Sequence, residues 1–397
     1  MVQTPVYMDN HATTRVDPRV VEAMLPLFHE KYGNAGSTSH VFGWDAKEAV
    51  DRSRESIARS IGASSREIVF TSGATESNNL AIRGCAERTR RRGNHIVSVA
   101  TEHKAILDPL AVLARRGFEV TLLPVRQMGE PVAGRLDVER VADAIRDDTL
   151  LVTVMLANNE IGVIQPLVEI GNLCKQRGVL LHTDATQAVG KIPVDVEQMQ
   201  IDLLSFSGHK LYGPKGIGGL YVRRRGPQVR LTPQIDGGGQ EGGRRSGTLN
   251  VPGIVGFARA LELCVDEMEA ESNRLFTLRD RLYQGLTSAI EHVTLNGPEL
   301  DQRDFRLAGN LSCSFADVDG EALMMSMRDL CVSSGSACTS TNPEPSHVLR
   351  AIGLSDDRTR ASLRFGIGRF NTEEEVDFAI GLLAEVVQRL RRMSSLA

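Results

Sequence analysis

Short runs of apolar and β-branched residues recur along the first two thirds of the chain. Each run ends in a polar loop that gives way to a helical pattern. Four segments follow this order: EIVFTSGATESNNLAI at 67–82, HIVSVATEHKAILDPL at 95–110, LLVTVMLANNEIG at 150–162 and VLLHTDATQAVG at 179–190. Strands that alternate with helices are typical of βαβ units and a mostly parallel sheet. We therefore predict an α/β fold whose large domain has a mostly parallel sheet flanked by helices.

The pattern changes from about residue 265. Long helices follow, with a strand near Asn310–Phe315 and a final amphipathic helix from about Thr372 to Arg392. This part is predicted to form a smaller α+β domain, and the Gly-rich segment 236–248 is expected to be a loop between the two parts. The expected domains are residues 15–260 for the large one, and residues 1–14 and 261–397 for the small one.

Composition excludes several classes of function. The chain has 397 residues, of which 41% are hydrophobic and 24% charged, and its formal net charge is −4. Basic residues form no stripe, so we expect no direct nucleic-acid binding. No apolar run approaches the ~20 residues that span a bilayer, and the first fourteen residues show no targeting pattern. We expect a cytoplasmic protein without membrane contact.

Cysteine and histidine spacing predicts neither a disulfide framework nor a metal site. The six cysteines form no CxxC pair and no zinc-type spacing with histidine. His11, His40 and His347 have no ligand-like spacing either, and they are expected to lie outside the functional site. Five cysteines stand in apolar or helical contexts that suit small buried side chains. The exception is Cys338, in the small polar segment VSSGSACTSTNPEP at 332–345.

The loops at the carboxyl ends of the predicted strands carry the candidate chemistry, because open α/β sheets bind ligands there. Ser72 to Glu76 join a strand to a helix, and the free N–H groups of that helix start suit a phosphate, although such a motif is also a common helix cap. Asp184 follows an apolar strand, where it either caps a helix or pairs with a protonated ring nitrogen. Lys210 follows the strand LLSFS and is either a surface residue or a Schiff-base lysine.

The joint occurrence of phosphate loop, Asp and Lys leads to a family resemblance. The motifs SGATESNN, NNEIG, HTDATQAVG, SGHKLYGPKG, RRSGTLN and SSGSACTS together resemble cysteine desulfurases of the iron–sulfur-cluster and nitrogen-fixation type, within the fold type I pyridoxal-phosphate enzymes. Weaker matches at YMDNHATT and LRFGIGRF extend the resemblance from about residue 7 to 370. It implies pyridoxal 5'-phosphate as the cofactor.

The resemblance also implies roles for individual residues around that cofactor. Lys210 would form the Schiff base, and Asp184 would pair with the pyridinium nitrogen. His103 would stack on the ring and assist proton transfer. Gln187 and Asn159 would hydrogen-bond the phenolate oxygen or its neighbourhood. The phosphate would be held by Ala74, Thr75, Ser207 and His209, together with Thr248 of the neighbouring subunit in a homodimer.

Substrate recognition is expected from Arg364, because a guanidinium group matches an amino-acid carboxylate bidentately. The alternative for Arg364 is a structural ion pair. Asn34 would help to bind the same carboxylate. Two positions depart from the family pattern: Ala35 stands where Pro is frequent, and Gly366 replaces a serine near Arg364.

The resemblance identifies Cys338 as the nucleophile that takes sulfur from L-cysteine, with release of alanine. The alternative is an incidental surface cysteine. The long loop resembles the desulfurases that pass sulfur to scaffold proteins. The acceptor is therefore expected to be an iron–sulfur scaffold or another sulfur acceptor, including those of tRNA or cofactor thiolation. Other interpretations are an aminotransferase, a selenocysteine lyase, or a non-catalytic sulfur carrier or docking protein.

Overall fold

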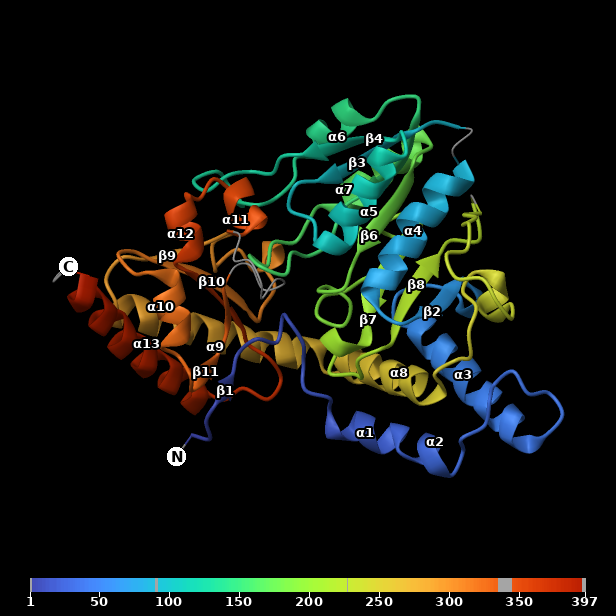
Figure 1. Ribbon diagram of the computed structural model, residues 1–397, viewed down its shortest axis with the longest axis horizontal. Helices are drawn as coiled ribbons and strands as arrows, with labels where there is room; N and C mark the ends of the chain where they lie inside the picture. Colours follow the sequence, from blue (N-terminus) through green and yellow to red (C-terminus); the bar gives the residue numbers. More distant parts are fainter. Residues whose placement is uncertain (1, 90–91, 227, 335–344, 395–397) are drawn as a thin grey trace.

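The computed structural model describes residues 2–89, 92–226, 228–334 and 345–394. Two lobes, each made of a sheet with helices packed against it, lie side by side (Figure 1). One is built on a seven-stranded sheet and the other on a four-stranded sheet. Helices α8, Val251–Asp266, and α9, Met268–Ala289, follow each other along the base of both.

The large sheet has the strand order β2-β8-β7-β6-β5-β3-β4. Strand β8 is antiparallel to both of its neighbours, and the other pairs are parallel, so β2 runs in the same direction as β7. The carboxyl ends of six strands therefore meet at one edge, which confirms the predicted α/β class. The strands are β2 Ile68–Thr71, β3 His95–Val99, β4 Glu119–Leu123, β5 Thr149–Thr153, β6 Leu180–Asp184, β7 Leu203–Ser207 and β8 Gly218–Val222.

Helices cover both faces of this sheet (Figure 1). Their cover explains why β2, β3, β5 and β7 are buried at every position and have nearly continuous apolar sequences rather than alternating ones. The helices are α1 Pro18–Met24, α2 Pro26–His29, α3 Val41–Arg59, α4 Ala74–Thr89, α5 Lys104–Arg115, α6 Val138–Ala144 and α7 Leu167–Arg177, with short 3-10 turns at Ser65–Glu67, Gly208–Lys210 and Gln240–Gly243.

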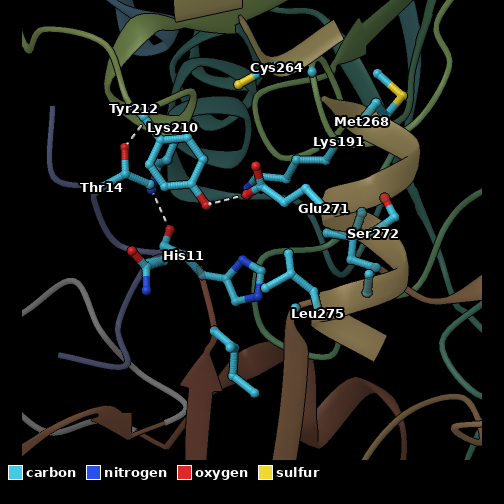
Figure 2. A pocket seen from close by; sticks show the side chains of 16 residues that line it. His11, Thr14, Lys191, Lys210, Tyr212, Cys264, Met268, Glu271, Ser272 and Leu275 are labelled. Atoms are coloured by element: carbon cyan, nitrogen blue, oxygen red, sulfur yellow. Dashed lines mark hydrogen bonds between the residues drawn. The ribbon is translucent and has the colours of Figure 1, made fainter. Parts of the chain in front are cut away.

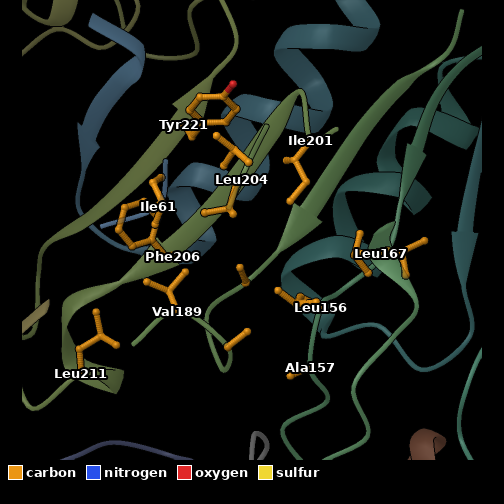
Figure 3. Packing of buried hydrophobic residues seen from close by; sticks show 14 of the residues in the cluster. Ile61, Leu156, Ala157, Leu167, Val189, Ile201, Leu204, Phe206, Leu211 and Tyr221 are labelled. Atoms are coloured by element: carbon orange, nitrogen blue, oxygen red, sulfur yellow. The ribbon is translucent and has the colours of Figure 1, made fainter. Parts of the chain in front are cut away.

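The main hydrophobic core lies between the large sheet and α3, α7 and α8. Leu204 and Phe206 of β7 point into it, toward Val189 and Ile61 (Figure 3). The Phe206 ring lies 5.1 Å from the ring of Phe257 on α8. This packing holds the end of β7, and with it the residues that follow, in a fixed position.

The smaller part contains the antiparallel sheet β12-β13-β10-β9 and the parallel pair of β1 with β11. Helices α9 and α13 pack against each other beside it. The predicted strand at Asn310–Phe315 and the predicted final helix are both confirmed. The elements are β1 Val6–Tyr7, β9 Val293–Leu295, the 3-10 turn Arg303–Phe305, β10 Asn310–Phe315, α10 Gly320–Met325, β11 Leu330–Cys331, β12 Ser333–Ser334, α11 His347–Ala351, α12 Asp356–Arg360, β13 Ser362–Gly366 and α13 Glu373–Ser394.

Hydrophobic packing divides the chain near the junction of α8 and α9. Cys264 of α8 belongs to the main core, whereas Leu278 of α9 belongs to a second core with Val6 and Met8. We propose this junction as the boundary between the domains, with the N-terminal strand assigned to the smaller one. Within the described part of the chain, no helix combines the length and the apolar character needed to cross a membrane.

Candidate active site

A cavity of about 560 Å³ opens at the carboxyl edge of the large sheet. Its lining comes from the loops after β2, β3, β5, β6 and β7, together with the N-terminal segment and β13. The structure thus brings together most of the residues predicted from sequence. Those that line this cavity are Ala74, Thr75, His103, Asn159, Asp184, Gln187, Ser207, His209, Lys210 and Arg364.

One end of the cavity is the start of α4. Ala74 and Thr75 lie in the first turn of this 16-residue helix, where backbone N–H groups have no partner within the helix. Gly73 before them has φ of +153°, and a Cβ atom there would stand 3.6 Å from Ser207 Oγ. Backbone donors of α4 and the hydroxyl of Ser207 therefore face the same space, which suits an anion such as phosphate.

Asp184, the last residue of β6, is held on both carboxylate oxygens. Asn78 of α4 donates to Oδ2 at 2.7 Å, and the N–H of Thr186 donates to Oδ1 at 3.0 Å. Beneath Asp184, Glu102 is buried, and burial raises the pKa of its carboxyl well above its usual range. Asp184 thus presents an oriented carboxylate to the cavity that it lines.

Lys210 lies directly after β7, in the turn Gly208–Lys210. Its Nζ donates to the carbonyl of His11, and to that of Ala12 at 2.6 Å. These backbone acceptors hold the amine at the cavity wall. The neighbouring ring of His209 contacts Thr13 Oγ1 at 3.2 Å, and burial, followed by the charge of Lys210, lowers the pKa of His209 to about 4. Because the His209 ring is neutral, it can lie next to the Lys210 side chain in the cavity lining without electrostatic repulsion.

His103 is the N-cap residue of α5. Its Nδ1 accepts the backbone N–H of Ala105 at 3.0 Å, which leaves the proton of the neutral ring on Nε2. Burial lowers the pKa of His103, while Asp184 opposes this shift. The ring is therefore neutral at physiological pH and fixed in orientation by the helix that it caps.

Arg364 in β13 is buried and lines the cavity. Its Nη2 donates to Asp9 Oδ1 at 2.8 Å and to Ser333 Oγ at 3.1 Å, and Nη1 donates to the carbonyl of Asn159 at 3.2 Å. Both sequence interpretations of Arg364 are thus present: it makes an ion pair and it faces the cavity. Among the residues that the structure describes, its buried Nε has no hydrogen-bond partner.

The departure at Gly366 has a structural reason. A Cβ atom at this position would stand 2.7 Å from the backbone nitrogen of His11 and 2.8 Å from that of Asn10. The strand β13 and the N-terminal segment therefore approach more closely than any side chain at 366 permits. Ala35, the other departure, is partly buried against the main core.

Two predicted residues, Asn34 and Thr248, are not brought to this cavity within one chain. Asn34 lines a different hollow, next to Glu241 and Arg54, and its Oδ1 accepts the N–H of Gly36 at 2.8 Å. Thr248 is exposed and is not part of the cavity wall. Cys338 lies outside the described residues.

Sequence reasoning missed His11, which was expected to lie outside the site. The structure places its ring at the cavity, 4% exposed, with Nδ1 at 3.1 Å from Gln187 Oε1. The expectation was wrong because it tested histidines only for metal-ligand spacing. The signal available was the motif YMDNHATT, in which His11 stands within one of the segments that carry the family resemblance.

Comparisons with known proteins agree with this arrangement. The aminotransferase class-V family matches residues 6–378. A cysteine desulfurase IscS from Anaeromyxobacter dehalogenans (strain 2CP-C) is 57% identical over 396 residues, covering 100% of this chain and 95% of that protein. The IscS of Rickettsia akari (strain Hartford) is 52% identical over 392 residues, with 99% and 93% covered.

Solved structures point the same way. A NifS-like protein superposes with a TM-score of 0.88 at 38% identity, covering 97% of this chain and 100% of that one. A structure described as SspA in complex with cysteine gives 0.80 at 36% identity, with 92% and 99% covered. The chain belongs to the class-V aminotransferase family and, within it, to the cysteine desulfurases of the IscS and NifS type.

Proposed function

We propose that this protein binds pyridoxal 5'-phosphate in the cavity at the carboxyl edge of the large sheet. It uses the cofactor to move sulfur from L-cysteine to Cys338, with release of L-alanine. The observation that carries the proposal is the convergence of the α4 start, Asp184 and Lys210 on one cavity, although they lie far apart in the sequence. Membership of the desulfurase family supports the substrate.

The residues present fit this cofactor. The first turn of α4, with Thr75, Ser207 and His209, offers donors for the phosphate. Asp184 is an oriented anion for the ring nitrogen, and Lys210 supplies the amine that binds the aldehyde. The neutral ring of His103, held by its bond to the Ala105 N–H, lines the same cavity. When bound, the cofactor supplies an electron-poor ring that withdraws electrons from the α-carbon of an amino acid.

The amino-acid carboxylate is assigned to Arg364. Burial of the guanidinium and its bonds to Asp9, Ser333 and Asn159 fix its position before any substrate arrives. A fixed group loses little entropy when it binds, and the unpartnered Nε gains a partner from a carboxylate placed beside it. Asn34 can reach the same carboxylate only from another subunit, since it lines a different hollow in its own.

Proton transfers are assigned to Lys210 and His103, which both line the cavity. A neutral amine on Lys210 can take the α-proton of cysteine and later return one to carbon. The thiolate of Cys338 attacks the substrate sulfur: a sulfur–sulfur bond forms, the carbon–sulfur bond breaks, and the carbon takes up a proton in place of sulfur. The products are L-alanine and a persulfide on Cys338.

The proposed reaction involves two protein partners, a sulfur acceptor and a second subunit. The persulfide would pass to an iron–sulfur scaffold protein or another acceptor in the cytoplasm. Thr248 is exposed in the single chain and would complete the phosphate site of a neighbouring subunit, so the active form would be a homodimer.

The decisive experiment compares the wild-type protein with Cys338→Ser at equal cofactor loading. Alanine and sulfide are measured after addition of L-cysteine and a reductant. We expect alanine formation to fall by a factor of about 100 or more in the variant, because the sulfur acceptor is gone. Equal activity in both proteins would instead indicate a lyase or aminotransferase, and no activity in either would indicate a non-catalytic carrier.

A further inference from the structure

A second, smaller cavity is lined by the N-terminal segment, Lys191, Lys210 and residues of α9 (Figure 2). Its volume is about 40 Å³, enough for one or two water molecules. His11 and Lys210 line both cavities, so together they form the wall between them. Lys191 and Glu271 line the small cavity and do not line the larger one (Figure 2).

Lys191 is the feature of this small cavity that the proposed reaction does not use. Lys191 lies four residues after Gln187 in the sequence, and its Nζ donates to Gln187 Oε1 at 2.8 Å. Among the residues that the structure describes, no carboxylate lies within ion-pair distance of this ammonium group. Burial lowers the pKa of Lys191 to about 8, so the group still carries a positive charge for most of the time at neutral pH.

The bond from Lys191 fixes which end of the Gln187 amide faces the cofactor cavity. An ammonium group has only donors, so it requires the amide oxygen on its side. The same oxygen receives His11 Nδ1 at 3.1 Å, and the Gln187 Nε2 group donates one hydrogen to the carbonyl of His11 at 2.9 Å. The second hydrogen of that NH2 group remains for the cofactor cavity, which Gln187 lines.

The ring of His11 cannot set this orientation, whereas the backbone carbonyl of His11, which only accepts, requires the NH2 end of Gln187 just as Lys191 requires the oxygen. A neutral imidazole nitrogen is a donor in one tautomer and an acceptor in the other, so it would satisfy either end of the amide. Burial and the neighbouring charges of Lys191 and Arg364 lower the pKa of His11 well below its usual range, which keeps the ring neutral. The obligatory donor in the network is therefore Lys191.

We infer that Lys191 is a positioning residue that acts through Gln187 on the bound cofactor. Together with the His11 carbonyl it holds the amide of Gln187 in one orientation, and it places a positive charge behind that amide. This inference rests on the proposed function. A donor and a positive charge at this place favour the more negative state of the cofactor–Lys210 linkage, so they lower the pH at which that linkage releases its proton.

Other titratable and charged groups surround Lys191 and stay in place when it is replaced. They come from each element packed around it: His11, Lys210, Cys264, Glu271 and Arg364. Glu271 is engaged by Tyr212 at 3.0 Å and by Arg369 at 2.9 Å. A change caused by replacing Lys191 therefore reports on its own charge and its bond to Gln187.

The test uses cofactor-loaded wild type, Lys191→Met and Lys191→Arg. The visible absorbance of the bound cofactor is titrated against pH without substrate. We expect the midpoint to rise by about 0.5–1 pH unit in the Met variant, which loses the charge and the donor. In the Arg variant, which keeps both, the midpoint should stay close to that of wild type.

An unchanged midpoint in Lys191→Met, at full cofactor loading, would overturn the inference. The same rise in the Arg and Met variants would overturn it as well, since a packing defect would then be the cause. If Lys191→Met does not fold, Lys191→Leu serves in its place, because it also removes the charge and the donor. Absence of a cofactor band in the wild-type protein would contradict the proposed function instead, so the two failures are distinguishable.

Discussion

Arg364 combines at one residue the two roles that its sequence context left open. Its guanidinium group forms an ion pair with Asp9, and the same side chain lines the cavity. We expect Arg364→Lys to raise the KM for L-cysteine by about tenfold or more, because an ammonium group cannot bind a carboxylate bidentately. Cofactor absorbance should be unchanged, since no cofactor contact is assigned to Arg364. Steady-state kinetics with the absorption spectrum check both statements, and a wild-type KM would contradict the substrate role.

Glu160 shows how a buried carboxyl couples the site to pH. Ser346 Oγ donates to Glu160 Oε2 at 2.5 Å. Burial raises the pKa of Glu160 from 4.5 to about 7, although the positive charge of Arg364 acts to lower it. Between these values the folded protein holds a proton that the unfolded chain has released. The contribution of this proton to stability is therefore complete below about pH 4.5 and is lost as the pH rises through about 7.

Replacing Glu160 by Gln should remove this dependence. Relative to wild type, Glu160→Gln is expected to gain up to about 3 kcal/mol in the free energy of unfolding between pH 5 and pH 8. Gln keeps an acceptor for Ser346, so the comparison isolates the proton. Urea unfolding at both pH values measures the difference. Parallel pH profiles for the two proteins would show that Glu160 does not titrate in this range.

At the scale of elements, the contact of β2 and β8 shapes the phosphate end of the cavity. A Cβ atom on Gly218 would stand 2.7 Å from both Gly73 Cα and the carbonyl oxygen of Phe206, and neither backbone atom can move freely. We expect Gly218→Ala to cost about 1–3 kcal/mol in stability and to weaken cofactor binding, because the strand must shift the start of α4. Gly381 in α13 meets nothing within 4 Å, so Gly381→Ala is the matched control.

The control is expected to move in the opposite direction. Alanine in a helix interior is favoured over glycine by about 0.5–1 kcal/mol, so Gly381→Ala should unfold at slightly higher urea concentration with cofactor affinity unchanged. Titration of the apoprotein with pyridoxal phosphate measures the affinity of both variants. Equal affinities for Gly218→Ala and wild type would mean that the α4 start is not the phosphate site.

Elements are also the scale at which the sequence was most informative. Strands β2, β5, β6 and β7 were predictable because continuous apolar runs end in polar loops, and parallel strands bring those loops to one edge. The network of Lys191, Gln187 and His11 was not predictable, since it joins residues that lie 176 positions apart through packing alone. The same holds for Glu160 and Ser346, which are 186 positions apart.

At the scale of the whole molecule, one chain leaves two predicted residues without a place in its own cavity. Thr248 is exposed, and Asn34 lines a separate hollow. Several large apolar side chains between α1 and the start of α3, the segment that contains Asn34, are exposed in the single chain. Exposed apolar patches of this kind mark interaction surfaces. Their position could not be related to function from sequence, because the proposed second subunit would decide what they face.

Hybrid dimers test whether Thr248 serves the neighbouring cavity. We expect Thr248→Ala alone to weaken cofactor binding by about tenfold, through the loss of one hydrogen bond to a charged phosphate, and Lys210→Ala alone to abolish the protein adduct that borohydride reduces. The two variants are co-expressed with different tags, and the hybrid is purified through both. If Thr248 acts across the interface, the hybrid has one intact cavity and one with both defects.

The outcome is read from cofactor titration of the hybrid. An intact cavity predicts half of the wild-type adduct, formed at the wild-type cofactor concentration. If Thr248 acted within its own subunit, the only cavity that keeps Lys210 would carry the Thr248 defect, and the same half adduct would require about ten times more cofactor. A hybrid that titrates in this weaker manner would contradict the shared site, because the total number of mutations is the same in both arrangements and only their distribution between the two cavities differs.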